Sequence, residues 1–216
     1  AHGQHLEGAP LGSFGTFSTF SFYSNKLITT GEGGMVLTNS DRLAERAREL
    51  RNLSFNPEKR FVHTTIGWNY RLTAMQAALG LSQLARMQDL LSHRQEIGKH
   101  YQDLLSDVHE LCLPMPQYRG SENVYWVFGV VLSTQDSRNS HEVMEELRLR
   151  GVGTRPFFYP LHKQPVLERY GVRPNQNLPT SEWLGAKGFY LPNGADSTPE
   201  TREYVAQQLR EVLAKL

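Results

Sequence analysis

Lys26 lies between an aromatic segment and a glycine-rich turn, in the stretch FSTFSFYSNKLITTGEGGMV that spans residues 17–36. The neighbours that bear on its chemistry are three serines and two aromatic residues: Ser18, Ser21, Ser24, Phe22 and Tyr23. Rings that exclude water lower the pKa of an ammonium group, and the neutral amine then attacks carbonyl carbon. The pattern therefore suggests Schiff-base chemistry, and the alternative is an ordinary solvated lysine between two strands.

A second group of functional side chains follows in RPFFYPLHKQP, residues 155–165, where Arg155, two phenylalanines, Tyr159 and His162 lie between prolines. Aromatic rings such as that of Phe158 pack well against the apolar face of a sugar. His162 is suited to hydrogen-bond a sugar hydroxyl or keto oxygen. The alternative for His162 is a purely structural role.

Composition excludes several classes of protein. The chain has 216 residues, 39% of them hydrophobic, and a net charge of +1, as expected for a globular protein. So small a charge gives no broad field for nucleic acid or an anionic membrane. We find no signal peptide and no membrane span. The single cysteine, Cys112, rules out an internal disulfide, fits a reducing cytoplasm, and is predicted to be a small core residue.

The first part of the chain predicts two strands followed by two helices. Residues 14–23 read as a strand, and MVLTN, residues 35–39, resumes as a second strand after the turn. A capped amphipathic helix is predicted from residues 39–41 onward. An irregular segment follows over residues 56–73, and then a long helix from Thr73 to about Ser106, with a bend expected at Gly80 and near LLSHR.

The second part of the chain reads as a small α/β domain. A buried strand over residues 123–132, a capped helix over 139–151 and a strand over 152–158 predict a crossover unit. STPE, residues 197–200, is predicted to be the capping box of a last helix. The buried stripe expected of that helix is Val205, Leu209, Val212 and Leu213. We place a domain boundary near residue 92.

Four stretches of this sequence resemble one enzyme family, in the family's order. They are residues 20–52 around Lys26, GWNYRLTAMQAALGLSQL, GTRPFFYPLHKQP and LPNGADSTPE. Together they resemble the DegT/DnrJ-type nucleotide-sugar aminotransferases, which use pyridoxal phosphate on the fold type I scaffold. The resemblance implies an α/β fold in which residues 1–92 are the C-terminal portion of the large cofactor domain. Residues 93–216 would then form the small C-terminal domain.

The resemblance also implies roles for single residues. Lys26 matches the lysine that bonds to the cofactor and moves a proton between cofactor and substrate carbons; related sugar dehydratases have histidine there. Ser21 matches a serine that binds the cofactor phosphate, and its alternative is a packing serine. Asn69 matches an asparagine that reaches the cofactor phosphate of the neighbouring subunit, and its alternative is a turn residue. No metal-binding residue is assigned.

The substrates and partners are likewise implied by the resemblance. The loop carrying Phe158, Tyr159 and His162 lies near the sugar nucleotide in the family. The sequence of this loop is most similar to that of the perosamine-forming members of the family, which aminate carbon 4 of GDP-4-keto-6-deoxymannose for lipopolysaccharide O-antigens. Glutamate is the expected amino donor, and a homodimer with shared active sites is the expected assembly. Neither nucleic acid nor a membrane is an expected partner.

One departure from the family leaves other interpretations open. The family motif E-D-x-A-Q-A-x-G ends at AHG, so its aspartate and glutamine would precede Ala1, as would a phosphate-binding loop and a stacking aromatic residue. Without the aspartate the cofactor ring would be poorly held in its protonated form. We therefore expect a chain cut from something longer. The alternatives are a non-catalytic fragment or interaction module of such an enzyme, and an unrelated α/β binding domain.

Overall fold

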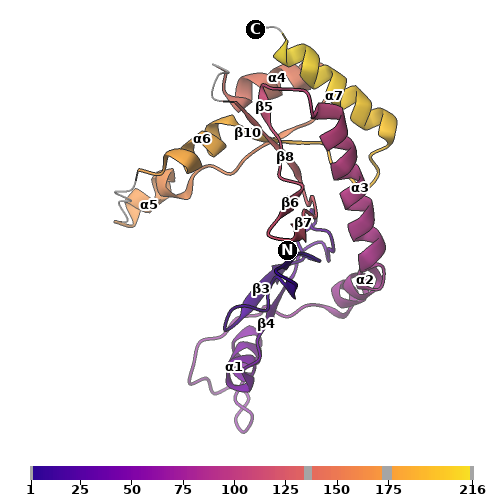
Figure 1. Ribbon diagram of the computed structural model, residues 1–216. Helices are drawn as coiled ribbons and strands as arrows, with labels where there is room; N and C mark the ends of the chain where they lie inside the picture. The colour runs from indigo at the N-terminus through magenta and orange to yellow at the C-terminus, as the bar shows by residue number, and fades with distance from the viewer. Residues whose placement is uncertain (1, 134–137, 172–176, 215–216) are drawn as a thin grey trace. The chain divides into compact units, whose positions relative to one another are not determined.

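The computed structural model describes residues 2–133, 138–171 and 177–214. Contacts divide the chain into two compact units (Figure 1), which are described separately. The first unit comprises Ala1–Ser92 and Gln117–Val124, and the second comprises His93–Pro116 and Tyr125–Leu216. A short segment, Gln117–Val124, thus leaves the second unit and contributes a hairpin to the first.

The first unit contains three antiparallel strand pairs and two helices of 11 residues. The strands are β1 (His5–Leu6), β2 (Ala9–Pro10), β3 (Ser18–Ser21), β4 (Gly34–Leu37), β6 (Gln117–Tyr118) and β7 (Ser121–Glu122). The helices are α1 (Asp41–Arg51) and α2 (Ala74–Leu84), and α3 (Met87–Leu105) begins in this unit. β3 pairs with β4 from Ser18 opposite Leu37 to Ser21 opposite Gly34.

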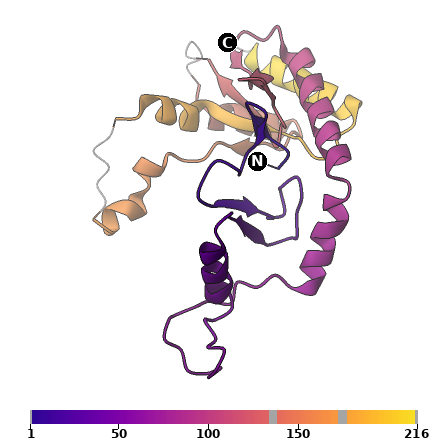
Figure 2. The same cartoon turned by 60° about the horizontal axis from the view of Figure 1, so that its bottom comes forward.

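The second unit is built on a four-stranded sheet with the strand order β5-β8-β10-β9. Its strands are β5 (Leu111–Cys112), β8 (Phe128–Leu132), β9 (Arg155–Pro156) and β10 (Gly188–Leu191). Its helices are α4 (Ser140–Leu149), η1 (Leu161–Lys163), α5 (Pro165–Arg169), α6 (Pro179–Lys187) and α7 (Pro199–Leu213). α7 lies beside the C-terminal half of α3 (Figure 2), where Arg210 donates to the carbonyl of Leu104 at 2.6 Å.

The predicted crossover unit exists, but its two strands are not neighbours. β10 lies between β8 and β9 and pairs antiparallel with each of them. β8 and β9 therefore run in the same direction with a strand between them, which is a split βαβ arrangement. The sequence analysis missed this because it assigned no strand to the short segment GFYL at Gly188–Leu191.

The hydrophobic core of the described residues lies in the second unit. Its fully buried side chains include Tyr101 and Leu105 of α3, Phe128 of β8, Phe189 of β10 and Leu209 of α7. In the first unit the buried hydrophobic residues among those described are Ile28 and Leu91. Apolar side chains on its strands and on α2 are exposed: Met35, Val36, Leu37, Met75, Leu79, Leu81 and Leu84.

Capping signals located the helices well, with two corrections in detail, of which the first is that Ser40 at the start of α1 makes no side-chain cap hydrogen bond. Asn139 and Glu142 form a complete capping box at the start of α4. The stripe predicted for α7, which comprises Val205, Leu209, Val212 and Leu213, is buried. At the start of α7, however, the cap is Thr198, whose hydroxyl accepts from the N–H of Thr201 at 3.3 Å. The predicted box between Ser197 and Glu200 was therefore wrong by one position.

The predicted long helix is interrupted at a different place from the expected one. α2 ends at Leu84 and α3 begins at Met87, so the break falls at Ala85 and Arg86 rather than at Gly80 or LLSHR. Arg86 donates its N–H to the carbonyl of Gln83 at 3.0 Å, a tighter i→i−3 bond that ends α2. No glycine or proline marks this break.

Three further predictions were wrong in extent or burial. The strand expected over residues 14–23 is reduced to β3, and that over 123–132 to β8. Cys112 is exposed rather than a core residue. Because side chains alternate along β5, Leu111 takes the buried position and Cys112 points the other way. In the part of the chain that the structure describes, no helix has the length and apolar character of a membrane span.

Candidate functional site

Lys26 lies in a closed loop between β3 and β4, residues 22–33, which we call the lysine loop. Two backbone hydrogen bonds close its neck: the N–H of Phe22 donates to the carbonyl of Gly33 at 2.8 Å, and that of Thr30 donates to Phe22 at 2.9 Å. Within the loop the N–H of Lys26 donates to the carbonyl of Tyr23 at 3.0 Å and forms a turn. The hairpin therefore holds the backbone of Lys26 just beyond the end of β3.

Two glutamines of α2 fasten the lysine loop. Gln83 donates to the carbonyl of Thr29 at 2.6 Å and accepts from the N–H of the same residue at 3.2 Å. Gln76 donates to the carbonyl of Glu32 at 3.0 Å. The backbone of the loop is thus bonded to side chains of a helix that lies 44 and 54 residues away in sequence. α2 is therefore a support for the lysine-bearing turn.

Two glycines allow this close packing. A Cβ atom at Gly33 would lie 2.3 Å from Oγ1 of Thr30 and 3.0 Å from Leu72. A Cβ atom at Gly80 of α2 would lie 3.0 Å from Cγ2 of Thr30. Gly80, which the sequence analysis interpreted as a bend, instead lets the lysine loop pack against α2.

The surroundings of Lys26 shift its pKa downward. Burial lowers the pKa of the half-buried Lys26 below its ordinary value of 10.5. The ring of His2 stacks at 5.8 Å on Phe20 and at 5.7 Å on Phe22. Burial, followed by positive charges that include Lys26, lowers the pKa of His2. His2 was missed by the sequence analysis, although it lies in the AHG segment that the family motif shares.

Ser21 ends β3 on its exposed side. Its hydroxyl oxygen accepts from the N–H of Tyr23 at 3.3 Å. A hydroxyl also has a proton to donate, which suits a phosphate oxygen. The three serines do not gather around Lys26 as the sequence suggested, because Ser18 and Ser21 lie on opposite faces of β3. A Cβ at Gly12 would meet both Ser18 and Phe20, which places these two together on the other face.

Asn69 lies in the first unit, in an exposed segment that runs along the end of α1. It forms a backbone bridge with Asn52, the residue that follows α1. Its amide oxygen accepts from Nε of Arg71 at 3.0 Å, and Arg71 also donates to the side chain of Asn52 at 2.9 Å. Arg71 thus holds the side-chain oxygen of Asn69. The NH2 group of Asn69 is the donor of this amide, so it is the group that can bind an anion.

Phe158, Tyr159 and His162 lie in the second unit, in a segment that we call the aromatic loop, residues 157–163. This loop contains both exposed and buried side chains, without a regular alternation. Phe158, Tyr159 and Leu161 are 79%, 58% and 74% exposed. Pro160 is buried, and the ring of Phe157 packs 4.9 Å from that of Tyr190. The loop therefore presents an aromatic surface on an anchored base.

His162 lies mostly within the anchored base, with a small exposed fraction. Its side chain is only 9% exposed, and Nε2 lies 3.1 Å from a carboxylate oxygen of Glu182 on α6. Lys163 donates to the other oxygen of Glu182 at 2.5 Å. Hydrogen bonds from Lys163 and then from His162 hold the pKa of Glu182 below its usual value. No sequence signal identified Glu182, because about twenty residues separate it from its partners.

Known proteins resemble this chain over nearly all of its length. Residues 1–210 match the model of the DegT/DnrJ/EryC1/StrS aminotransferase family. GDP-perosamine synthases of Caulobacter vibrioides and Escherichia coli O157:H7 are 36% and 34% identical over 99% and 98% of this chain, and over 57% and 56% of their own lengths. The structure of the aminotransferase TlmJ of Streptoalloteichus hindustanus superposes with a TM-score of 0.87 at 28% identity, covering 98% of this chain and 56% of that one. The chain thus spans about half the length of the curated relatives it matches.

Proposed function

Because the chain belongs to the DegT/DnrJ/EryC1/StrS aminotransferase family, we propose that its protein transfers an amino group to a nucleotide-linked keto sugar with pyridoxal phosphate. The observation that carries the proposal is Lys26, with its lowered pKa, on a loop fixed by two glutamines of α2. Within the family, the likeness to GDP-perosamine synthases supports carbon 4 of a GDP-linked 4-keto-6-deoxyhexose as the acceptor. Glutamate is the proposed donor.

The residues present suit the aldehyde and the phosphate of pyridoxal phosphate. An amine whose pKa is lowered by burial is suited to an aldehyde carbon, and an exposed hydroxyl at a strand end is suited to a phosphate. When bound, the cofactor supplies an electron sink for the carbon that gains or loses a proton. We assign to Lys26 the holding of the cofactor and the carriage of that proton at Nζ, and to Ser21 a hydrogen bond to the phosphate.

The aromatic loop is proposed to hold the sugar. Phe158 and Tyr159 offer ring faces to the C–H face of a hexose, and their exposure leaves those faces available. His162 is proposed to hydrogen-bond a polar group of the same sugar. Because residues 1–92 would carry the cofactor and 93–216 the sugar contacts, the two roles are proposed to fall on separate domains.

A direct assay tests the proposed reaction. Purified protein is incubated with pyridoxal phosphate, glutamate and GDP-4-keto-6-deoxymannose, and the products are identified by mass spectrometry. We expect an amino sugar with the mass of GDP-perosamine and an equal amount of 2-oxoglutarate. The matched control replaces the substrate by a TDP-4-keto-6-deoxyhexose. Amination of neither sugar would contradict the proposed function, and amination of only the TDP sugar would correct the nucleotide.

We further propose that two copies share their active sites through Asn69. The segment around Asn69 carries apolar side chains that another chain would cover. These are Phe61, Val62, Ile66, Trp68 and Tyr70, with exposed fractions of 80%, 55%, 79%, 48% and 74%. A self-complementary contact would bring each Asn69 to the neighbouring copy's cofactor and so form two equivalent sites.

Mixing two inactive variants tests this sharing. Lys26→Ala and Asn69→Ala are each expected to be impaired alone. If Asn69 serves the other copy, a mixed dimer regains one intact site, so random exchange should restore about a quarter of the wild-type activity. The control mixes each variant with itself under the same exchange conditions. No recovery, once exchange is verified by native mass spectrometry, would show that Asn69 serves its own chain or has no such role.

A further inference from the structure

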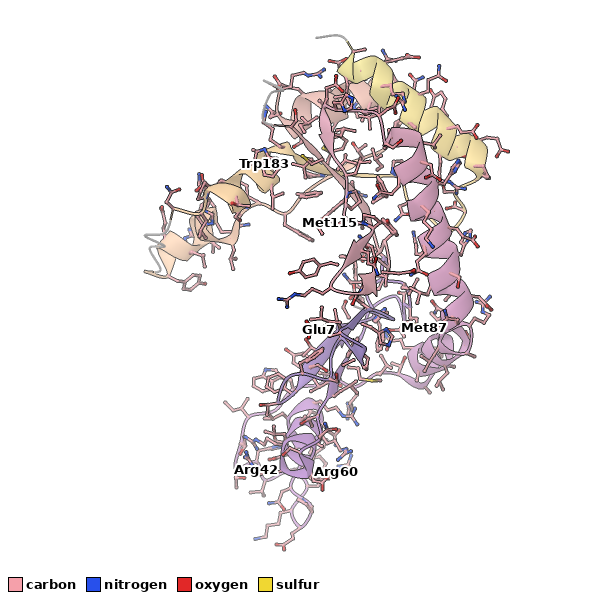
Figure 3. All side chains as sticks on the ribbon, in the orientation of Figure 1. Glu7, Arg42, Arg60, Met87, Met115 and Trp183 are labelled. Carbon is pink, nitrogen blue, oxygen red and sulfur yellow. The ribbon has the colours of Figure 1, made fainter. Side chains whose placement is uncertain are left out.

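The aromatic loop is fastened to the second unit at three places, and two of them involve a glycine of the second unit. The N–H of Phe157 donates to the carbonyl of Gly188 at 3.0 Å, and a Cβ at Gly188 would lie 2.3 Å from the ring of Phe157. A Cβ at Gly185 would lie 2.8 Å from Pro160. The third fastening is Glu182, and it is the only one of the three that is ionic. α6, marked by Trp183 in Figure 3, carries both Glu182 and Gly185.

The carboxylate of Glu182 accepts hydrogen bonds from two adjacent residues of the aromatic loop. One carboxylate oxygen faces Nε2 of His162 and the other binds Nζ of Lys163. A carboxylate accepts hydrogen bonds and, when ionised, donates none. A neutral His162 that faces it must therefore carry its proton on Nε2, which leaves Nδ1 as an acceptor. In that state Nδ1 can bind a hydroxyl group but has no proton to give to a keto oxygen.

We propose that Glu182 is the positioning residue of the aromatic loop: it fixes the tautomer of His162 and the direction in which Phe158 and Tyr159 face. This inference rests on the proposed function for the identity of the ligand. It deepens that function by assigning a sugar hydroxyl, and not the keto oxygen, to His162. Glu182 touches no substrate and acts through its two partners, His162 and Lys163.

The kinetic test uses the cofactor-loaded enzyme with three variants. In Glu182→Ala, the loss of a charge-assisted hydrogen bond should raise KM for the sugar nucleotide about tenfold. KM for the amino donor and kcat should change by less than about twofold, because no reacting atom is touched. Glu182→Gln keeps an acceptor for Nε2–H, so its KM should lie between those of Glu182→Ala and the wild type. Glu145→Gln is the matched control, since Glu145 is exposed and paired with Arg148 on α4.

A spectroscopic arm reads the tautomer without substrate. Long-range ¹H–¹⁵N spectra of the histidine rings should show Nε2 protonated and Nδ1 unprotonated for His162 in the wild type and in Glu182→Gln. In Glu182→Ala the ring should shift toward a mixture of the two tautomers. His162→Asn identifies the resonances. If Glu182→Ala folds poorly, Glu182→Gln is compared with the wild type instead, both for the His162 spectrum and for KM.

The outcomes separate this inference from the proposed function. If the enzyme aminates no nucleotide sugar, the proposed function fails and the spectra alone decide whether Glu182 sets the tautomer. If Glu182→Ala leaves both KM for the sugar nucleotide and the His162 spectrum as in Glu145→Gln, the inference is overturned. A fall in kcat together with equal rises in both KM values would also overturn it, because this pattern would indicate general structural damage.

Discussion

Replacing Lys26 by alanine should reduce kcat/KM for amino transfer by about a thousandfold or more, because it removes the only group assigned to move the proton. The lysine loop itself should persist, since its backbone bonds to Gln76 and Gln83 do not involve the lysine side chain. The measurement is turnover of the sugar nucleotide under saturating cofactor, together with a circular dichroism spectrum of each variant.

Two control variants distinguish charge from nucleophilicity. Lys26→Arg keeps a positive charge, but a guanidinium does not lose its proton at accessible pH and cannot replace the amine. We expect it to be as inactive as Lys26→Ala. Lys99→Ala removes an exposed lysine from α3 and should be active. Substantial turnover by Lys26→Arg would contradict the assigned role.

The lowered pKa of Lys26 also gives a direction for pH. Burial disfavours the ammonium form, so the fraction of neutral amine rises with pH through a pKa below the ordinary lysine value of 10.5. The rate at which the protein combines with free pyridoxal phosphate should therefore rise with pH over a range lower than that of an exposed lysine. Stopped-flow absorbance in a pH series measures it.

The largest effect on stability is expected at Gly98, where α3 packs on Tyr125. A Cβ atom at Gly98 would lie 2.2 Å from Cγ of the Tyr125 ring, and both residues are buried. Tyr125 is fully buried and its ring stacks 5.9 Å from that of Phe128, so the ring has little room to move away. Overpacking should outweigh the gain in helix propensity, so Gly98→Ala should lower the free energy of unfolding by about 2 kcal/mol.

Urea unfolding measures the effect, with Gly153→Ala as its control. Gly153 has no atom within 4 Å of an added Cβ, among the residues described, and its φ is not in the left-handed region. Gly153→Ala should change stability by less than about 1 kcal/mol, in either direction. If Gly98→Ala unfolds at the same urea concentration as Gly153→Ala, the packing of α3 on Tyr125 is misjudged.

Local signals predicted the helices of this chain better than its sheet. Capping residues and apolar periodicity located α1, α4 and α7, because both are properties of a few adjacent residues. The split sheet was not predictable in the same way. Its middle strand, β10, has four residues and depends on partners in β8 and β9, which are far away in sequence.

The same distinction holds for the candidate sites. Lys26, Ser21 and Asn69 are marked by the resemblance, and the structure adds what holds them in place. Gln83 binds Thr29, which is 54 residues away in sequence, and Glu182 binds His162, which is about 20 residues away. Nothing in the sequence next to Gln83 or Glu182 indicates these contacts. Sequence motifs thus predict which groups do chemistry, whereas the groups that orient them are set by the tertiary fold.

Covalent labelling is the direct test of Lys26 as the cofactor lysine. The protein is mixed with pyridoxal phosphate, reduced with borohydride, digested and mapped by mass spectrometry. We predict one pyridoxyl group per chain, on the peptide that contains Lys26, with no matching label in Lys26→Ala. Labelling spread over exposed lysines, or equal labelling of Lys26→Ala, would contradict the assignment of Lys26 as the cofactor lysine.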